Sequence, residues 1–401
     1  MSLKQPDPLH ILLLPSWYPD SPDDVKGVFF RDQALALASL GHRVGVLAPR
    51  LKSLRSLFSG SKALSGYQVD EGLFTYRQEV LAALPRLPYG NYLLLKRAAL
   101  KLFARYVLAH GKPDIIHAHA AIFGGAIATG LGKAFGIPVV ITEHSSGFAR
   151  SLYKRWQIQL AATAFSEAVS CIAVSPSLGQ LLEAAFPIPK GGWKWIPNVV
   201  SDRFCSGIVN GANPRSVRFL NLALMTENKG QFDLLKAFHQ IREDGLDAEL
   251  WLAGDGVARS ELGKLALELA IEDRVRFLGL VNPEHVPKLL GTVDVMVVSS
   301  HYETFGLVAA EALMAGLPVV ATRCGGPECI VLDGDGELVK AGDPRSLAIG
   351  MKKVAENLTV YDPEVLKERA RARFSASAIA GRLTQEYEQV IGSYVKSRTS
   401  V

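Results

Sequence analysis

The stretch from residue 293 to residue 316 constrains the fold most. It begins with an apolar, β-branched run at 293–298, which has the length of a buried parallel strand. Residues 307–315 are rich in Ala, Leu and Val and contain no proline, so they favour a helix, and Gly316 follows as a stop signal. A parallel strand that leads directly into a helix is the repeating unit of an α/β fold.

The turn between this strand and this helix is predicted to bind an anion. Gly306, at the helix start, lacks the Cβ that would keep a phosphate away. The N–H groups of Gly306, Leu307 and Val308 have no partner inside the helix, and the helix dipole favours negative charge there. Glu303 and Glu311 flank this position, at the strand end where open α/β sheets bind ligands. A capped helix with a solvated glutamate at each end is the simpler alternative.

The same alternation of strands and helices runs through both halves of the chain. Strands are expected at 10–15, 43–48, 113–119 and 137–142, and again at 218–224, 248–253, 274–279 and 317–322. The 401 residues suffice for two or three domains. We therefore expect two Rossmann-like α/β domains with a boundary near residue 200.

Composition narrows the class of protein. No apolar run reaches about 18 residues and residues 1–10 lack the apolar region of a signal peptide, so neither a transmembrane helix nor a leader is expected. The four cysteines are irregularly spaced, which argues against disulfides and zinc and fits a reducing cytoplasm. The net charge of +5 does not by itself indicate nucleic acid as a partner. The expected location is cytoplasmic.

Residues 50–106 are more basic than the rest of the chain. They contain ten Lys or Arg against three acidic residues, which gives +7 and exceeds the +5 of the entire sequence. Leu, Phe and Tyr are interleaved with these charges. A solvated basic face is one interpretation. The other is a surface for an anionic membrane or a phosphate-bearing acceptor, which would place the protein peripherally on the inner face of a membrane.

Histidines end two predicted strands of the first half. His117 and His119 are two residues apart on one strand, so they point to the same face, and His144 follows the next strand. No carboxylate-rich spacing accompanies them, so no metal site is expected. A core histidine hydrogen-bonded to the backbone is the simpler alternative for each of them.

Other ligand motifs are incomplete. Gly254-x-Gly256 lacks its third glycine because Arg259 occupies that place, so a nicotinamide cofactor is not expected. The D-x-D at Asp333 and Asp335 falls in a turn-forming stretch and is interpreted as structural. The chain has no Walker G-x-x-x-x-G-K sequence. No cofactor is expected.

The stretch from Glu303 to Glu311 resembles the E-x7-E signature of the retaining family 4 glycosyltransferases, which have the GT-B fold. Gly-His-Arg-Val at 41–44, Ile-Pro-Asn at 196–198 and Asn-Lys-Gly at 228–230 extend the resemblance along nearly the whole chain. It implies an acceptor domain over 1–200 and a donor domain over 201–376 that face across a cleft. It also implies that the helix of 377–401 packs back on the first domain.

The resemblance implies roles for individual residues. On the donor side, Lys229 would bind the phosphates, Glu311 would bind the ribose, and backbone groups at Leu280 would bind the base. Glu303 and Phe305 would contact the donor sugar, and Gly27 would approach the phosphates or the sugar. The N-terminal residues of the helix, Gly306, Leu307 and Val308, would bind the anion. On the acceptor side, His119 and His144 would line the cleft near the reacting sugar. Glu303, His119 and Lys229 are the expected catalytic residues.

The function implied is metal-independent, retaining transfer of a hexose-type sugar from a nucleotide diphosphate sugar to a glycan, glycolipid or other hydroxyl acceptor. One alternative is a sugar phosphorylase or synthase of the same fold, but no motif marks a lysine for pyridoxal phosphate. Another is a pseudoenzyme that binds a nucleotide sugar or acts as a scaffold. The presence of Glu303, Glu311, Lys229 and His119 opposes that alternative.

Two positions depart from the family pattern. Val199 replaces the glycine that usually follows Ile-Pro-Asn, and Leu224 replaces an arginine that usually binds the phosphates together with the lysine. One fixed positive charge is therefore missing. Either Lys229 and the helix N-terminus suffice, or another cation such as Arg323 replaces that arginine.

Overall fold

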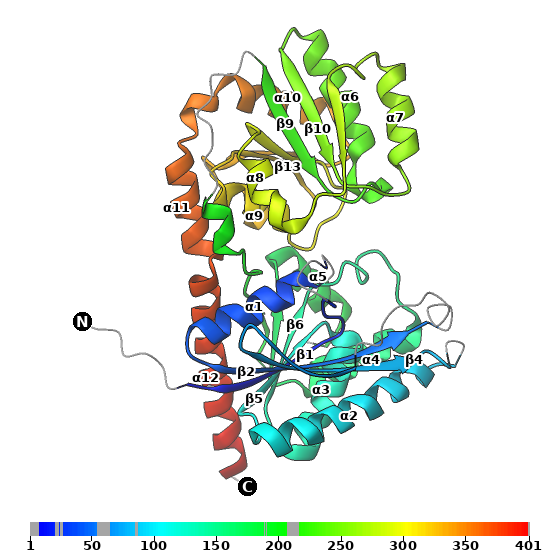
Figure 1. Cartoon of the computed structure of the whole chain (residues 1–401), viewed down its shortest axis with the longest axis vertical. Helices are drawn as coiled ribbons and strands as arrows, with labels where there is room; N and C mark the ends of the chain where they lie inside the picture. Colours follow the sequence, from blue (N-terminus) through cyan, green and yellow to red (C-terminus); the bar gives the residue numbers. More distant parts are fainter. Residues whose placement is uncertain are drawn as a thin grey trace, which may run out of the picture. The chain divides into compact units, whose positions relative to one another are not determined.

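The computed structural model describes residues 8–20, 24, 27–53, 65–84, 87–187, 189, 191–206 and 216–399. Within them the chain forms two compact α/β units, drawn in Figure 1. Unit 1 contains the residues up to 174, 178–199 and the chain from 379 onward, and unit 2 contains 175–177 and 200–378. The glycines, asparagines and proline of 206–214 predict a loop, and most of it lies outside the described residues.

Unit 1 is built on an eight-stranded sheet with the order β3-β4-β2-β1-β5-β6-β7-β8. Its strands are β1 (His10–Pro15), β2 (Arg43–Lys52), β3 (Gly66–Asp70), β4 (Leu73–Leu81), β5 (Ile115–His119), β6 (Val139–Glu143), β7 (Ser170–Ala173) and β8 (Trp193–Trp195). All neighbours are parallel except β3 and β4. Residues 11–14 of β1 are at most 1% exposed, because an all-apolar central strand is covered on both faces.

The helices of unit 1 connect these parallel strands. They are α1 (Val28–Ser39), α2 (Gly90–His110), α3 (Ala126–Phe135), α4 (Arg155–Glu167) and most of α5 (Pro176–Ala185). The small residues of 124–135 favour a helix from residue 124 onward, but α3 begins at Ala126 because residues 121–125 form a separate turn with non-helical backbone angles. α2 packs on β2 and β4.

The last helix, α12 (Ala376–Thr399), packs on unit 1 from residue 379 onward, as predicted. Its Thr384 hydroxyl lies 2.8 Å from Nε2 of His42. Its Tyr387 hydroxyl lies 2.6 Å from Nδ1 of His117. Ile379, Leu383 and Tyr387 are at most 1% exposed, so the helix forms part of the core of unit 1.

Unit 2 has a fully parallel sheet with the order β11-β10-β9-β12-β13-β14. Its strands are β9 (Val217–Leu222), β10 (Ala248–Ala253), β11 (Val275–Gly279), β12 (Val295–Val298), β13 (Val319–Arg323) and β14 (Gly336–Lys340). Its helices are α6 (Gln231–Glu243), α7 (Arg259–Glu268), α8 (Val286–Leu290), α9 (Leu307–Met314), α10 (Pro344–Glu356) and α11 (Pro363–Phe374). The parallel sheet of unit 2 and the mostly parallel sheet of unit 1 confirm the predicted α/β class.

Sequence signals account for the start of α10 and for the core of unit 2. The Asp343 carboxylate accepts a hydrogen bond from the backbone N–H of Ser346 at 3.1 Å and caps α10, with Pro344 at the first helical position. Phe219, Leu250 and Val297 lie in one buried cluster with apolar residues of α6 and α10. In the described part of the chain, no helix is long and apolar enough to cross a membrane.

Candidate active site

The predicted strand, turn and helix of unit 2 form as β12 and α9. Gly306 lies between them with φ of 93°, a left-handed conformation that favours glycine. On α9, Leu307, Val308 and Glu311 are half-buried, whereas Ala309, Ala310 and the last turn are buried. The N-terminus of α9 and the Glu311 side of its first turns therefore form the accessible part of this helix.

Lys229 and Glu303 form an ion pair beside this turn. The Lys229 Nζ lies 2.5 Å from Oε1 of Glu303, and their side chains are 26% and 16% exposed. The Ser300 hydroxyl donates to the same Glu303 oxygen at 2.7 Å. The two residues that the sequence assigned to the phosphates and to the donor sugar thus lie together at the carboxyl edge of the sheet.

Backbone contacts hold the lysine loop against the glutamate loop. The N–H of His301 donates to the carbonyl oxygen of Asn228 at 2.8 Å, and the Ser299 hydroxyl donates to the carbonyl oxygen of Lys229 at 2.8 Å. A Cβ on Gly230 would lie 2.0 Å from the Ser299 carbonyl oxygen. Gly230 is therefore required for this close approach. Ser299 and Ser300 were not predicted from the sequence, because serines after a strand have no distinctive spacing.

A second contact fixes the Glu303 backbone to the loop after β13. Its N–H donates to the carbonyl oxygen of Cys324 at 3.0 Å, and its carbonyl oxygen accepts from the N–H of Gly326 at 2.9 Å. A Cβ on Gly326 would lie 2.2 Å from the Phe305 carbonyl oxygen. The Gly-Gly sequence thus allows two loops to pack without side chains between them.

Phe305 differs from its expected role. Its side chain is 2% exposed and packs edge-to-face on Phe374 at 5.9 Å between ring centroids. Burial in the core of unit 2 leaves only the backbone of Phe305 for the predicted contact with the donor sugar.

Leu280 and the two positions that concern the missing arginine are exposed. Leu280 follows β11 and is 74% exposed, and Leu224 follows β9 and is 61% exposed. Arg323 is exposed at the end of β13. Of these, only Arg323 could supply the positive charge missing at position 224.

The predicted histidines of unit 1 form one buried cluster. The rings of His117 and His119 lie side by side on one face of β5, with centroids 4.4 Å apart. Nδ1 of His119 lies 3.0 Å from Nε2 of His144. His119 has no exposed surface and His144 is 7% exposed. Because His119 is enclosed, it can contribute to its predicted role on the acceptor side only through a neighbouring residue. His144 lies nearer the surface.

A buried glutamine on α1 completes this cluster. The Nε2 of Gln33 lies 3.4 Å from Nδ1 of His117 and 3.5 Å from Nε2 of His119. The Tyr387 hydroxyl lies nearer to Nδ1 of His117, at 2.6 Å, so the Gln33 amide is a secondary polar neighbour of the two rings. Gln33 was not predicted from the sequence. The signal that points to it is a polar residue among the buried positions of α1.

Burial keeps these imidazoles neutral. It lowers the pKa of His117 and of His144 to about 3, and it lowers the pKa of His119 well below 6.5, with a further contribution from the neighbouring His117 and His144. The cluster is therefore a set of neutral hydrogen-bonding groups near neutral pH.

An aromatic cavity of about 250 Å³ opens at the same sheet edge of unit 1. The rings of Trp17, Phe123, Phe148 and Tyr153 line it. The buried Glu143 carboxylate also lines it and accepts backbone N–H groups from the loops after β5 and β6 at 2.8–2.9 Å. Burial raises the pKa of that carboxyl. These aromatic residues were missed, because they come from separate loops without a shared motif.

Gly27 begins α1 next to this cavity. Its φ is 78°, and a Cβ there would lie 2.9 Å from Cδ1 of Trp17. The glycine therefore allows Trp17 to pack on the start of the helix. Its predicted contact with the donor stays a prediction.

The D-x-D motif is structural, as predicted. Asp335 is fully buried and forms ion pairs with Arg369 at 3.2 Å and Arg373 at 2.9 Å, both on α11. Among the described residues, no group of three His, Cys, Asp or Glu side chains could hold a metal ion. The expectation that no metal takes part stays a prediction.

Comparisons with known proteins agree with this architecture. Residues 27–204 match the family model Glycosyltransferase Family 4, and residues 209–373 match the model Glycosyl transferases group 1. The chain is 32% identical over 269 residues to an uncharacterized glycosyltransferase of Methanocaldococcus jannaschii, covering 62% of this chain and 67% of that protein. It is 26% identical over 376 residues to a glycogen synthase of Mycobacterium tuberculosis, covering 90% and 88%.

Solved structures share the fold. A sucrose-phosphate synthase from Thermosynechococcus elongatus superposes with a TM-score of 0.77 at 22% identity, covering 96% of this chain and all of that one. Anabaena HepE, in complex with UDP and glucose, superposes with a TM-score of 0.69 at 20% identity, covering 95% and 99%. The predicted GT-B fold is thus confirmed, and the chain belongs to the group 1 glycosyltransferases of family 4.

Proposed function

We propose that the protein is a retaining glycosyltransferase that moves a hexose-type sugar from a nucleotide diphosphate sugar to a hydroxyl acceptor. The observation that carries this proposal is the Lys229–Glu303 pair beside the N-terminus of α9, which has no side-chain cap and begins after the left-handed Gly306. Departure of a diphosphate requires stabilisation of its growing negative charge. A lysine and a helix N-terminus provide that stabilisation without a metal.

Donor binding in this proposal exchanges the partners of the ion pair. Lys229 leaves Glu303 and contacts the phosphates, and Glu303 then accepts hydrogen bonds from the donor sugar. Both side chains are partly exposed, so neither has to be withdrawn from the core for this exchange. Glu311 binds the ribose, and the backbone at Leu280 binds the base. Structures of related fold support nucleotide binding, since Anabaena HepE is in complex with UDP-glucose and a starch synthase of Arabidopsis thaliana is bound to ADP and acarbose.

The acceptor side of the proposal rests on unit 1. The aromatic cavity presents ring faces that suit the apolar face of a pyranose, and a glycan or glycolipid supplies such a ring. The neutral pair of His119 and His144 lies near the ends of the adjacent strands β5 and β6. We assign His144 the direct hydrogen bond to the acceptor and His119 the role of holding the ring of His144 in position.

A panel of UDP-, GDP- and ADP-hexoses tests the donor. A nucleotide sugar at 100 times its dissociation constant should stabilise the protein by about 2.7 kcal/mol in thermal unfolding. Transfer to glycan and glycolipid acceptors is then measured with excess chelator present, and nuclear magnetic resonance of the product reports the anomeric configuration. Retention of configuration without metal is the expected result.

Paired variants sharpen this test. Glu303→Gln keeps the shape of the side chain but removes its charge, and it should abolish transfer in a folded protein. Glu227→Gln, an exposed carboxylate in the lysine loop, is the matched control and should transfer like the wild type. Nucleotide sugar binding without transfer to any acceptor would favour the pseudoenzyme, and an inverted product would exclude the retaining mechanism.

A further inference from the structure

The basic segment of residues 50–106 separates into two parts in the structure. One part lies on β2 and β4, and the other lies on α2. Arg55, Lys62 and Arg86 lie outside the described residues. The two parts differ in whether nearby acidic side chains neutralise their charges.

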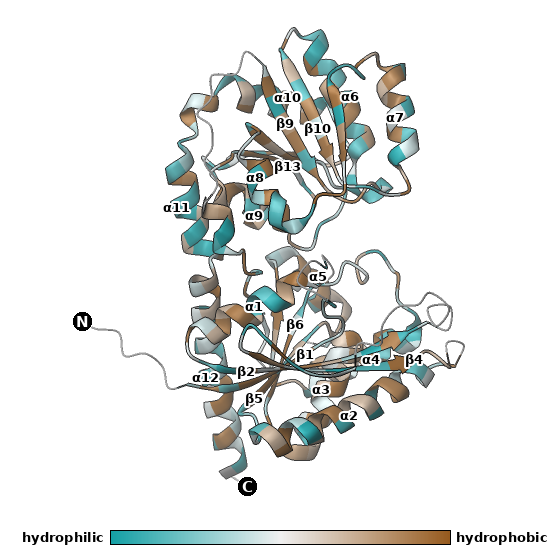
Figure 2. Cartoon of the chain, viewed as in Figure 1, coloured by the Kyte–Doolittle hydropathy of each residue, from teal (hydrophilic) through white to brown (hydrophobic). Residues whose placement is uncertain are grey.

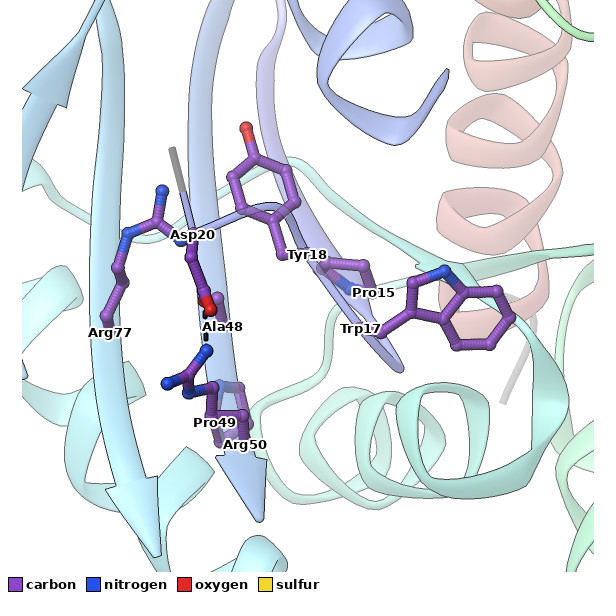
Figure 3. Close-up of a pocket in the computed structure, with 8 residues that line it drawn as sticks. All are labelled: Pro15, Trp17, Tyr18, Asp20, Ala48, Pro49, Arg50 and Arg77. Atoms are coloured by element: carbon purple, nitrogen blue, oxygen red, sulfur yellow. Dashed lines mark ion pairs between the residues drawn. The ribbon is translucent and has the colours of Figure 1, made fainter. Parts of the chain in front are cut away.

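The cations of β2 are neutralised locally. Arg50 forms ion pairs with Asp20 and Glu79, and Lys52 lies 3.2 Å from the same Glu79. Figure 3 shows the Arg50 guanidinium directed at the Asp20 carboxylate. These charges are therefore engaged inside unit 1 and add little to its outer field.

Arg77 on β4 is withdrawn from the surface in a different way. Its guanidinium lies 5.1 Å from the centre of the Tyr18 ring, and its Nη1 donates to the carbonyl oxygen of Pro19 at 2.8 Å. Burial lowers the pKa of this guanidinium. Within the described part of the segment, the cations without a nearby acidic partner must therefore be sought on α2.

α2 contains no acidic residue from Gly90 to His110. It contains Lys96, Arg97, Lys101 and Arg105, and none of the four has an ion pair within the described residues. Two other acids of the segment, Asp70 and Glu71, pair instead with Arg31 of α1. The positive charge of α2 is thus not compensated within the described chain.

The exposed residues of α2 lie on one face of the helix. They recur at steps of one, three and four residues, at positions 93, 97, 100, 101, 104, 105, 108 and 109. Three of them are leucines, Leu93, Leu100 and Leu108, which are 57%, 40% and 90% exposed. The opposite face, which includes Leu95, Leu102 and Tyr106, is buried in unit 1. Figure 2 shows hydrophobic and hydrophilic positions alternating along α2.

We propose that this face of α2, the Leu93–Leu108 face, lies on the surface of an anionic lipid bilayer. Each lysine or arginine near such a surface is attracted to anionic headgroups, and leucines on the same face enter the boundary between headgroups and acyl chains. Cations and exposed leucines on one helical face match a partner that is anionic at its surface and apolar just beneath. This inference concerns attachment alone and does not depend on the proposed reaction.

Vesicle sedimentation of the full chain tests the proposal. The protein should bind vesicles that contain phosphatidylglycerol and should not bind vesicles of phosphatidylcholine alone. Binding should weaken as salt is raised, because exposed charges are screened. The triple variant R97Q/K101Q/R105Q should lose roughly 100-fold in partition, since each basic residue contributes about 1 kcal/mol near the surface.

Matched variants separate the Leu93–Leu108 face from net charge. The triple variant K236Q/K264Q/K288Q removes three exposed lysines from unit 2 and should sediment like the wild type. L93S/L100S/L108S keeps every charge and should reduce binding, most visibly at high salt. Circular dichroism and thermal unfolding check that each variant is folded.

Three outcomes would overturn the proposal. The first is absence of wild-type binding to anionic vesicles at low salt. The second is equal loss of binding in the α2 and unit 2 charge variants, which would indicate net charge alone. The third is wild-type behaviour of the leucine variant together with full competition by a soluble acidic polysaccharide, which would identify an acidic polymer as the partner instead of a bilayer.

Discussion

The candidate site residues of unit 2 are charged and partly exposed, whereas those of unit 1 are neutral and buried. Lys229 and Glu303 face each other within reach of solvent, so either can exchange its partner for a ligand group at modest cost. His117, His119 and His144 are enclosed, and their hydrogen bonds hold the rings in fixed orientations. Unit 2 is therefore arranged to change its contacts on binding, and unit 1 to keep a fixed geometry.

The largest expected effect that would test this comparison is acid destabilisation of unit 1. Folding holds the pKa of His117 and His144 at about 3, below the 6.5 of an unfolded chain, so the unfolded state binds more protons between these values. Their stabilising contribution is complete above pH 6.5 and is lost as the pH falls. The loss is about 1.4 kcal/mol per histidine and pH unit, or roughly 5 kcal/mol for both at about pH 4.5.

Denaturant unfolding at several pH values measures this loss. Tryptophan fluorescence reports mainly on unit 1, which contains Trp17, Trp156, Trp193 and Trp195, while unit 2 contains Trp251. His144→Gln should flatten the pH dependence by about half and leave a folded protein. An unchanged slope in that variant would show that His144 is not held neutral by burial.

The second effect concerns the charged pair of unit 2. Lys229→Ala should reduce turnover by roughly 100- to 1,000-fold, equivalent to about 2.7–4 kcal/mol, because the leaving diphosphate loses its fixed cation. Steady-state kinetics and titration with nucleoside diphosphate measure this loss. The comparison variant is Arg323→Ala. If Arg323→Ala reduces turnover more than Lys229→Ala does and both variants are folded, then Arg323 performs the role of the family arginine that Leu224 replaces.

The third effect separates binding from transfer. Glu311→Ala should weaken nucleoside diphosphate binding by about 1.5–3 kcal/mol, since the ribose hydroxyls lose a charged acceptor. His119→Ala should instead reduce transfer while leaving that affinity nearly unchanged. Calorimetric titration of both variants is the measurement. Full affinity in Glu311→Ala would remove this residue from the donor site.

The smallest effect restores the family charge at position 224. Leu224→Arg should tighten diphosphate binding by about 0.2–1 kcal/mol, because the side chain is largely exposed and its charge would be screened. Salt dependence of the calorimetric affinity checks the cause, and Leu224→Gln serves as an uncharged control of similar length. Equal tightening by the two variants would show that charge is not responsible.

Local signals in the sequence were sufficient for most elements of the fold. The predicted strand at 10–15 is β1, and the predicted helix at 307–315 is α9 to within one residue. Both contain dense apolar runs, and α9 is bounded by glycines. The cap of α10 by Asp343 is a local signal of the same kind, since capping depends on residues close in the chain.

Contacts between distant segments could not be predicted. The Lys229–Glu303 pair joins residues 74 positions apart, and Gln33 reaches His117 across 84. The burial of Phe305 depends on Phe374, which belongs to a helix that the sequence reading did not identify. Likewise, the net charge of residues 50–106 follows correctly from counting residues in the sequence. However, the neutralisation of Arg50 depends on Asp20, which lies outside that segment.

The packing of α12 on unit 1 has a consequence for the order in which the chain folds as it is synthesised. Unit 2, residues 200–378, leaves the ribosome before α12 does, and its sheet needs no later strand. Unit 1 must wait, because Thr384 and Tyr387 supply the partners of His42 and His117. Unit 1 is therefore translated first but completed last. Until α12 docks, the histidines of unit 1 and the core surface that α12 covers stay open to water.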